Sequence, residues 1–112
     1  MSSEYEKWLI VSDIDGTLNN KLRRLPAINK TKIKEYVDNG GYFTLCSGRN
    51  LQSLTPHYKK LGIETPAMFL NGAGIYDFKT NKMLSFTGVS EEAENAILKC
   101  ALLVKEAEVS IF

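Results

Sequence analysis

The sequence predicts an α/β domain organised around a parallel β-sheet, and two observations support this fold class. Between residues 7 and 70, short apolar runs of strand length alternate with longer stretches of helical period. Strands joined through helices pair in parallel, with right-handed crossovers. Three of the apolar runs also end in glycine and small polar residues, as strands of an open α/β sheet do where they carry a binding site.

The first half of the chain predicts two strands and one helix. The first strand covers about residues 7 to 12, and a loop through Pro26 leads to a helix from near Asn29 to Asp38. A Gly-Gly pair ends that helix, since glycine readily adopts the left-handed conformation at helix C-termini. The second strand follows over residues 42 to 46.

The second half predicts a helix, a strand, a hairpin and a final helix. Residues 50 to 61 form the helix, which Pro56 is expected to kink or to restart at Thr55, because proline lacks a backbone N–H. A third strand over 67 to 70 precedes the hairpin. Its two strands cover residues 75 to 78 and 83 to 86. Ser90 then caps a helix whose apolar positions follow the helical period, namely 93, 96, 97, 100, 101 and 104.

The predicted topology leaves the first strand at an edge of the sheet. Strands two and three lie on one side of it, and the other side has no partner within the predicted parallel sheet. An edge of apolar side chains and unpaired backbone groups favours association. We therefore expect self-association or pairing with a further segment of chain.

Two carboxylates stand where the first strand ends. Asp13 and Asp15 are two residues apart, so both point to the same side of an extended segment, and Gly16 lets the chain turn away. One carboxylate can attack phosphorus while the other transfers protons, and both offer hard oxygen ligands to Mg2+. An ordinary turn is the alternative interpretation. A calcium-binding EF-hand is excluded, because a strand rather than a helix leads into the motif.

Two later strand ends carry residues that suit a phosphate group. After the second strand, Ser47 and Gly48 offer a hydroxyl and backbone N–H groups at a helix start, and Arg49 offers a planar fork of donors. After the third strand, Asn71 and Gly72 form a turn. Taken alone, each segment is an ordinary helix cap or turn. Because the carboxyl ends of parallel strands meet in one crevice, the three segments together indicate one functional site.

The order and spacing of these segments resemble the haloacid dehalogenase-like (HAD) superfamily, in its Cof-type branch of Mg-dependent sugar-phosphate phosphatases. Residues 13–17 resemble its first motif, 47–49 its second, and 71–73 an Asn-Gly-Ala turn common in the branch. The resemblance implies a HAD-like Rossmannoid sheet, with Asp13 as nucleophile and metal ligand. Asp15 would be the general acid and base, with its backbone carbonyl on the metal.

The same resemblance implies the ligands. The substrate would be a small phosphorylated metabolite, and the cofactor would be Mg2+, held by Asp13 and Asp15. The residues that it implies for phosphate or substrate binding are Gly16, Thr17, Ser47, Gly48, Arg49, Asn71 and Gly72.

The third and fourth motifs of that family, a charge-balancing Lys and an acidic metal-binding segment, are not recognisable here. The chain therefore looks like an amino-terminal part, with residues 1–88 as half of the core and 89–112 as the start of an inserted α/β cap. We expect these 112 residues alone to be weakly active or inactive, and to pair with a missing carboxyl-terminal half. Two alternatives stay open: a truncated domain that binds Mg2+ and an anion without turnover, and one half of a split protein. A phospho-receiver domain fits less well, since its acceptor Asp lies on a later strand than its acidic pair.

Composition argues against several other classes of protein. The formal net charge is +1, which does not favour a nucleic-acid surface. No segment approaches the roughly 20 apolar residues of a membrane span, and the polar start lacks the features of a signal peptide, so we expect a cytoplasmic location. One basic cluster is expected to form a solvated face or a rim that attracts anionic substrate, and it consists of Lys21, Arg23 and Arg24.

The lone histidine and the two cysteines have ordinary interpretations. His57 lies on a polar stretch and is expected at the surface. Cys46 and Cys100 sit in apolar contexts without CxxC spacing, so we expect both to be small core residues rather than redox or zinc-binding groups.

Overall fold

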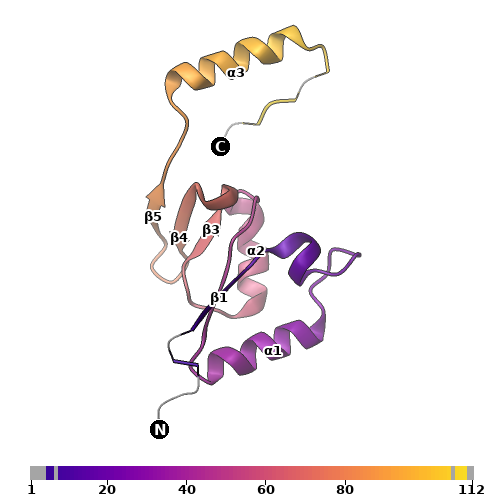
Figure 1. The fold of residues 1–112 in the computed structure, drawn as a ribbon, viewed down its shortest axis with the longest axis vertical. Helices are drawn as coiled ribbons and strands as arrows, with labels where there is room; N and C mark the ends of the chain where they lie inside the picture. The colour runs from indigo at the N-terminus through magenta and orange to yellow at the C-terminus, as the bar shows by residue number, and fades with distance from the viewer. Residues whose placement is uncertain (1–4, 7, 107, 111–112) are drawn as a thin grey trace.

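The computed structural model describes residues 5–6, 8–106 and 108–110, and its strands and helices alternate as predicted. In chain order the elements are β1 (Leu9–Ser12), a helical turn η1 (Ile14–Leu18), α1 (Ala27–Asp38), β2 (Tyr42–Leu45), α2 (Leu51–Leu61), β3 (Ala67–Phe69), a 3-10 turn η2 (Leu70–Gly72), β4 (Gly74–Asp77), β5 (Lys82–Phe86) and α3 (Glu91–Leu103) (Figure 1). The predicted start of the first strand at residue 7 lies outside the described residues.

The strand order matches the predicted topology. β1 and β2 pair in parallel, with Leu9 opposite Tyr42, and β3 joins the far side of β2 through a parallel bridge between Cys46 and Met68. β3, β4 and β5 then continue as an antiparallel sheet. The predicted α/β fold with a parallel sheet, and the predicted hairpin, are thereby confirmed. The antiparallel pairing of β3 with β4 is an addition that the hairpin pattern alone did not indicate.

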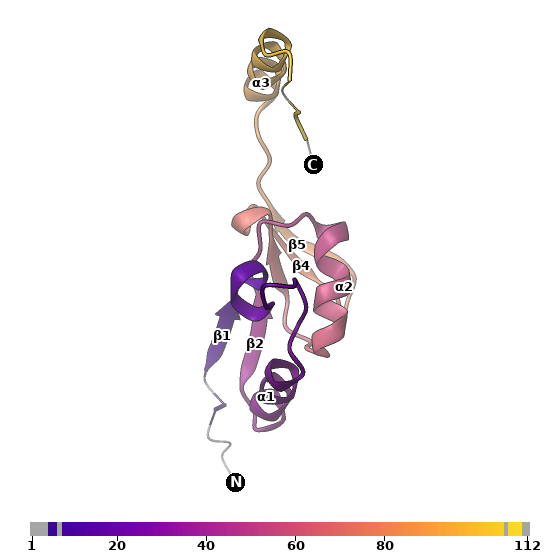
Figure 2. The same cartoon turned by 90° about the vertical axis from the view of Figure 1, so that its right-hand side faces the viewer.

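The hydrophobic core lies between the sheet and the two helices that cover one of its faces. Figure 2 shows α1 and α2 on the same side of the strands, and both helices contact the sheet. The apolar face of α2 supplies Leu54, Tyr58 and Leu61, each buried, which follows the predicted helical period. The remaining core members come from strands, η1, α1 and the loop before β3, and they are Ile14, Ile33, Phe43, Leu45, Ile63, Ala67 and Phe69.

Two helix predictions need correction. α1 begins at Ala27, directly after Pro26, rather than near Asn29, because the fixed φ of proline suits the start of a helix. α2 runs through Pro56 without the predicted restart. It is held from its first turn, where the Asn50 side chain accepts a hydrogen bond from the Ser53 N–H at 2.8 Å. Pro56 is exposed, so its ring does not compete for core space.

The helix α3 stands apart from the sheet at the end of an extended segment over residues 87–90 (Figures 1 and 2). Ser90 caps it as predicted, since its Oγ accepts a hydrogen bond from the Ala93 N–H at 3.2 Å. The predicted core position of Cys100 is wrong, because α3 leaves this residue exposed, and Cys46 is only half-buried. Within the described residues, no helix combines the length and the apolar character needed to cross a bilayer.

The free edge of β1 leads to a prediction about association. Leu9, Ile10 and Val11 are 52%, 43% and 46% exposed, and in the described part of the chain β1 pairs with β2 alone. We expect the 112-residue polypeptide to self-associate through this edge, with Ile10→Lys shifting it toward monomer in light scattering. Leu22→Lys is the matched control, since Leu22 is an exposed apolar residue of a loop. A wild-type chain that stays monomeric at high concentration, with slow amide exchange over residues 9–11, would contradict this.

Candidate active site

The two predicted catalytic carboxylates are both exposed at the end of β1. Asp13 and Asp15 are exposed, whereas Ile14 between them is 2% exposed and packs in the core. This alternation is what the spacing of the motif predicts, because successive side chains of an extended segment point to opposite sides. Gly16 then takes a left-handed φ of +79°, which turns the chain away from the strand direction. The buried Ile14 thus anchors a loop that presents both acids to solvent.

Backbone hydrogen bonds tie the second predicted segment to the third. The Ser47 N–H donates to the Met68 carbonyl at 3.1 Å, the Leu70 N–H to the Arg49 carbonyl at 3.0 Å, and the Asn71 N–H to the Ser47 carbonyl at 2.9 Å. Within the segment, the Ser47 hydroxyl oxygen accepts a bond from the Arg49 N–H at 3.1 Å. Residues 47–49 and 68–71 therefore form one supported unit at the carboxyl ends of β2 and β3.

The third segment packs closely against the second. Leu70, Asn71 and Gly72 have left-handed φ values of 48°, 55° and 93°. This turn places the Asn71 side chain over Gly48, where an added Cβ would come within 3.2 Å of Asn71 Oδ1. A side chain at position 48 would therefore need the Asn71 amide to shift by a few tenths of an ångström. Of the predicted residues, Gly72 and Thr17 are exposed and, in the described structure, take part in no side-chain hydrogen bond with the others.

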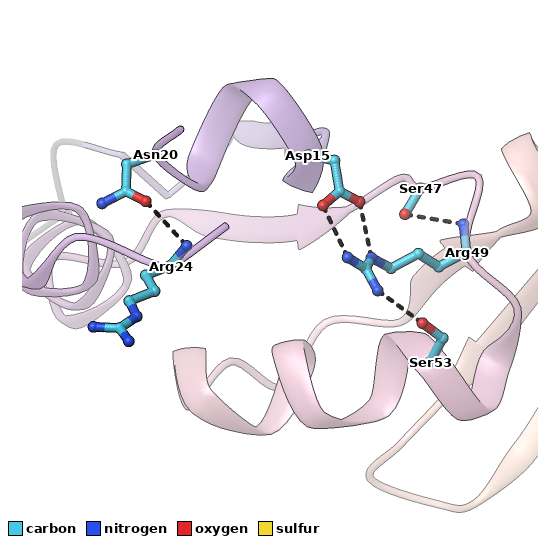
Figure 3. Close-up of polar contacts among 6 residues, drawn as sticks. All are labelled: Asp15, Asn20, Arg24, Ser47, Arg49 and Ser53. Carbon is cyan, nitrogen blue, oxygen red and sulfur yellow. Dashed lines mark hydrogen bonds and ion pairs between the residues drawn. The ribbon is translucent and has the colours of Figure 1, made fainter. Parts of the chain in front are cut away.

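Arg49 joins the second segment to the first. Its Nε and Nη2 donate to the two oxygens of Asp15, both at 2.8 Å, and its Nη1 donates to Ser53 Oγ at 2.8 Å (Figure 3). The hydrogen bond from Arg49 holds the pKa of Asp15 below its ordinary value of 3.8, and the same bond raises the pKa of Arg49. The structure thus brings together Asp15 and Arg49 in a two-point ion pair.

His57 lies nearer to this pair than its polar sequence context predicts. It is half-buried on α2 rather than fully at the surface. Burial lowers its pKa, and the neighbouring charges of Arg49 and Lys60 lower it further.

The donor set for a metal is small but suitable. Among the described residues, no group of three or more His, Cys, Asp or Glu side chains gathers at one point. Mg2+ in phosphate sites commonly takes one or two carboxylates and completes its shell with water and substrate oxygens. Asp13, whose exposed carboxylate has no salt bridge in the described structure, fits that requirement, whereas the Asp15 carboxylate is engaged by Arg49. The residues present therefore fit part of a Mg2+ site.

Two polar residues near the site escaped prediction. Ser53 accepts from Arg49, which lies before the N-cap of α2, so no helical spacing in the sequence indicated the contact. Asn19 is 7% exposed, and its burial after the Asp13 loop has no signature in the sequence.

Comparison with known proteins agrees with this geometry. The family model of haloacid dehalogenase-like hydrolases matches residues 10–112. The chain belongs to this family. Among solved structures, a HAD-like hydrolase from Bacteroides thetaiotaomicron superposes with a TM-score of 0.79 at 24% identity, covering 89% of this chain and 38% of that one. The HAD-like family, predicted from three short motifs, is thereby confirmed.

Curated relatives of this HAD-like chain include phosphatases. A 5-amino-6-(5-phospho-D-ribitylamino)uracil phosphatase of Bacillus subtilis is 36% identical over 88 residues, covering 79% of this chain and 30% of the relative. A pyridoxal phosphate phosphatase of Escherichia coli is 28% identical over 76 residues, covering 68% of this chain and 28% of the relative. The chain spans about a third of the length of the curated relatives it matches.

Proposed function

We propose that the protein is a Mg2+-dependent phosphatase that hydrolyses a small phosphorylated metabolite, such as a sugar phosphate, through an aspartyl-phosphate on Asp13. The observation that carries the proposal is the exposed pair Asp13 and Asp15 beside the supported segment 47–49. Two adjacent strand ends thus supply a nucleophile, a proton-transfer group and hydrogen-bond donors for a phosphate. The phosphatases among the curated relatives support the same reaction class.

In the proposed reaction, a carboxylate oxygen of Asp13 attacks phosphorus in line with the leaving oxygen. A bond forms between the Asp13 carboxylate oxygen and phosphorus, giving an acyl phosphate, the bond to the leaving oxygen breaks, and Asp15 gives that oxygen its proton. Water then attacks the phosphorus, Asp15 takes up the proton of the water, and inorganic phosphate and free Asp13 result. Mg2+, held by Asp13 and the Asp15 carbonyl, would neutralise phosphate charge during transfer.

Phosphate binding in this proposal falls to the segments after β2 and β3. The Ser47 hydroxyl and the N–H groups at the start of α2 bind the phosphoryl oxygens, and Arg49 contributes cationic donors. Gly48 and Asn71 shape this wall through their close contact. Gly16, Thr17 and Gly72 belong to the predicted substrate-binding set as turn residues around it.

We further propose how the chain divides. Residues 1–88 form the first half of the HAD core, and residues 89–112 begin an inserted cap, in keeping with the separate position of α3. Further chain in the complete protein, pairing with the free edge of β1, would supply the charge-balancing Lys and an additional acidic ligand. A cytoplasmic location is part of the same proposal.

The proposal is tested by phosphate release from an aryl phosphate and from a panel of sugar phosphates. The protein produced from its own gene is expected to release phosphate with Mg2+ present and to stop when a chelator removes the metal, because the phosphoryl charge is then unbalanced. A protein that binds Mg2+ and inorganic phosphate yet turns over none of the esters would be a binding domain, and the proposal would be wrong.

A further inference from the structure

A cavity opens beside Asp15, along the loop that follows β1. Its volume is about 400 Å³, and its walls are Asp15, Gly16, Asn19, Asn20, Lys21 and Arg23. The phosphate-binding residues after β2 and β3 do not line it. Asp15 thus lines this cavity and also contacts Arg49 of the segment after β2, as suits a general acid between a phosphoryl group and its leaving group.

The basic side chains of this cavity stand on a loop that is internally bonded. The Asn20 side-chain oxygen accepts from the Leu22 N–H at 3.0 Å, and from the Arg24 N–H at 3.1 Å, the contact drawn in Figure 3. The Asn20 carbonyl also accepts from the Arg23 N–H at 2.9 Å. These bonds hold Arg23 at a left-handed φ of 56°, which is uncommon for a residue with a side chain. Lys21 and Arg23 are therefore placed at the cavity by the loop itself.

Asn19 supplies an independent sign of a ligand. It is 7% exposed, and within the described structure its Nδ2 is buried without a hydrogen-bond partner. Buried amide donors are nearly always paired, so an acceptor from outside the chain is expected there. Asn19 lines both the cavity beside Asp15 and a space of about 20 Å³ next to His57 and Lys60, which has room for one water.

The charges of the cavity select an anion. Asp15 is the acidic member of the wall, and its carboxylate is paired with Arg49. Lys21 and Arg23 form no salt bridge in the described part of the chain, so the wall carries an excess of positive charge and several N–H donors. Carboxylate and phosphate oxygens match these donors.

We propose that this cavity holds the leaving-group part of the substrate, and that this part carries a second anionic oxygen group, a carboxylate or a second phosphate. The inference rests on the proposed phosphatase function and narrows its substrate class. The transferred phosphate lies against Ser47, and the second anion lies against Arg23, Lys21 and the Asn19 amide. Asp15 lies between them and protonates the bridging oxygen.

The test compares substrates that differ in this second group alone, using the protein produced from its own gene. 3-Phosphoglycerate and glycerol 3-phosphate differ by a carboxylate in place of a hydroxymethyl group, and fructose 1,6-bisphosphate and fructose 6-phosphate differ by one phosphate. We expect kcat/KM to be about tenfold or more higher for the anionic member of at least one pair, as charged hydrogen bonds in a partly enclosed site give. The pair that shows the preference identifies the anion.

Two arginine variants show where the preference arises. Arg23→Gln is expected to reduce the kcat/KM preference for the anionic substrate to about twofold or less. Arg24→Gln removes the same charge one residue away, outside the cavity wall, and is expected to keep the preference. Equal loss in both variants would indicate diffuse attraction and overturn the subsite, as would hydrolysis of both pairs without preference. Calorimetry with an Asp13→Asn protein measures the binding of the same substrate pairs without turnover. A binding preference that depends on Arg23, in a wild-type protein without phosphatase activity, would support the subsite and reject the proposed function.

Discussion

Replacing Asp13 with asparagine is expected to lower the phosphatase turnover of the protein by about a thousandfold or more, with the fold unchanged. An amide of the same shape cannot act as the attacking oxygen, and each tenfold step in rate corresponds to about 1.4 kcal/mol of barrier. Because Asp13 is exposed at the end of β1 and forms no salt bridge in the described structure, the substitution leaves the core in place. Initial rates on an aryl phosphate, with circular dichroism and thermal melting, measure both parts.

The matched control for this variant is Asp38→Asn. Asp38 ends α1 and pairs with Lys34 on the surface, so its substitution removes a carboxylate of the same size away from the site. Its turnover should stay within about twofold of wild type, since exposed ion pairs contribute little to stability. An Asp13→Asn protein that keeps more than about a tenth of wild-type turnover would show that another residue attacks phosphorus.

Much of the fold was predictable because its signals are local. The Asp-x-Asp-Gly exit from β1 and the Ser90 cap of α3 depend on residues adjacent in sequence, and both appear as predicted. The continuity of α2 was not predictable, because it depends on Pro56 facing solvent rather than on its propensity. The exposure of Cys100 likewise depends on what packs against α3, which periodicity cannot report.

The candidate site shows the same division. The positions of Asp13, Asp15 and Ser47 follow from strand ends, so the sequence located them. The partner of Arg49 did not follow, because a guanidinium suited to phosphate suits a carboxylate equally well. Nor was the burial of Asn19 foreseeable, since it depends on residues of α2 that are far away in sequence and not on any local pattern.

The Asp15–Arg49 pair gives a prediction about pH. Arg49→Gln is expected to raise the pKa of Asp15 back toward 3.8, because the hydrogen bond from Arg49 is the main cause of its lowering. The alkaline limb of the pH profile of kcat/KM, which reports loss of the proton from the general acid, should therefore move to higher pH. In wild type, the stability that Asp15 gains from ionisation is present above pH 3.8 and is lost as pH falls through its lower folded pKa. In the variant this dependence should disappear.

The same variant should lower kcat/KM about a hundredfold, because removal of one donor from a transition-state site costs about that much. An incoming phosphate can take over the Arg49 donors, which frees Asp15 to hold the proton that the leaving oxygen needs.

Two controls separate the roles of Arg49: Arg49→Lys keeps the charge without the planar fork, and Ser53→Ala removes the hydroxyl that accepts from Nη1 while leaving the pair with Asp15 intact. Carboxyl carbon NMR of Asp15 follows the pKa directly. The opposite outcome is an Asp15 titration that stays unchanged in Arg49→Gln. That result would show that the ion pair does not control the protonation of Asp15, and the control would have to be assigned to a group other than Arg49.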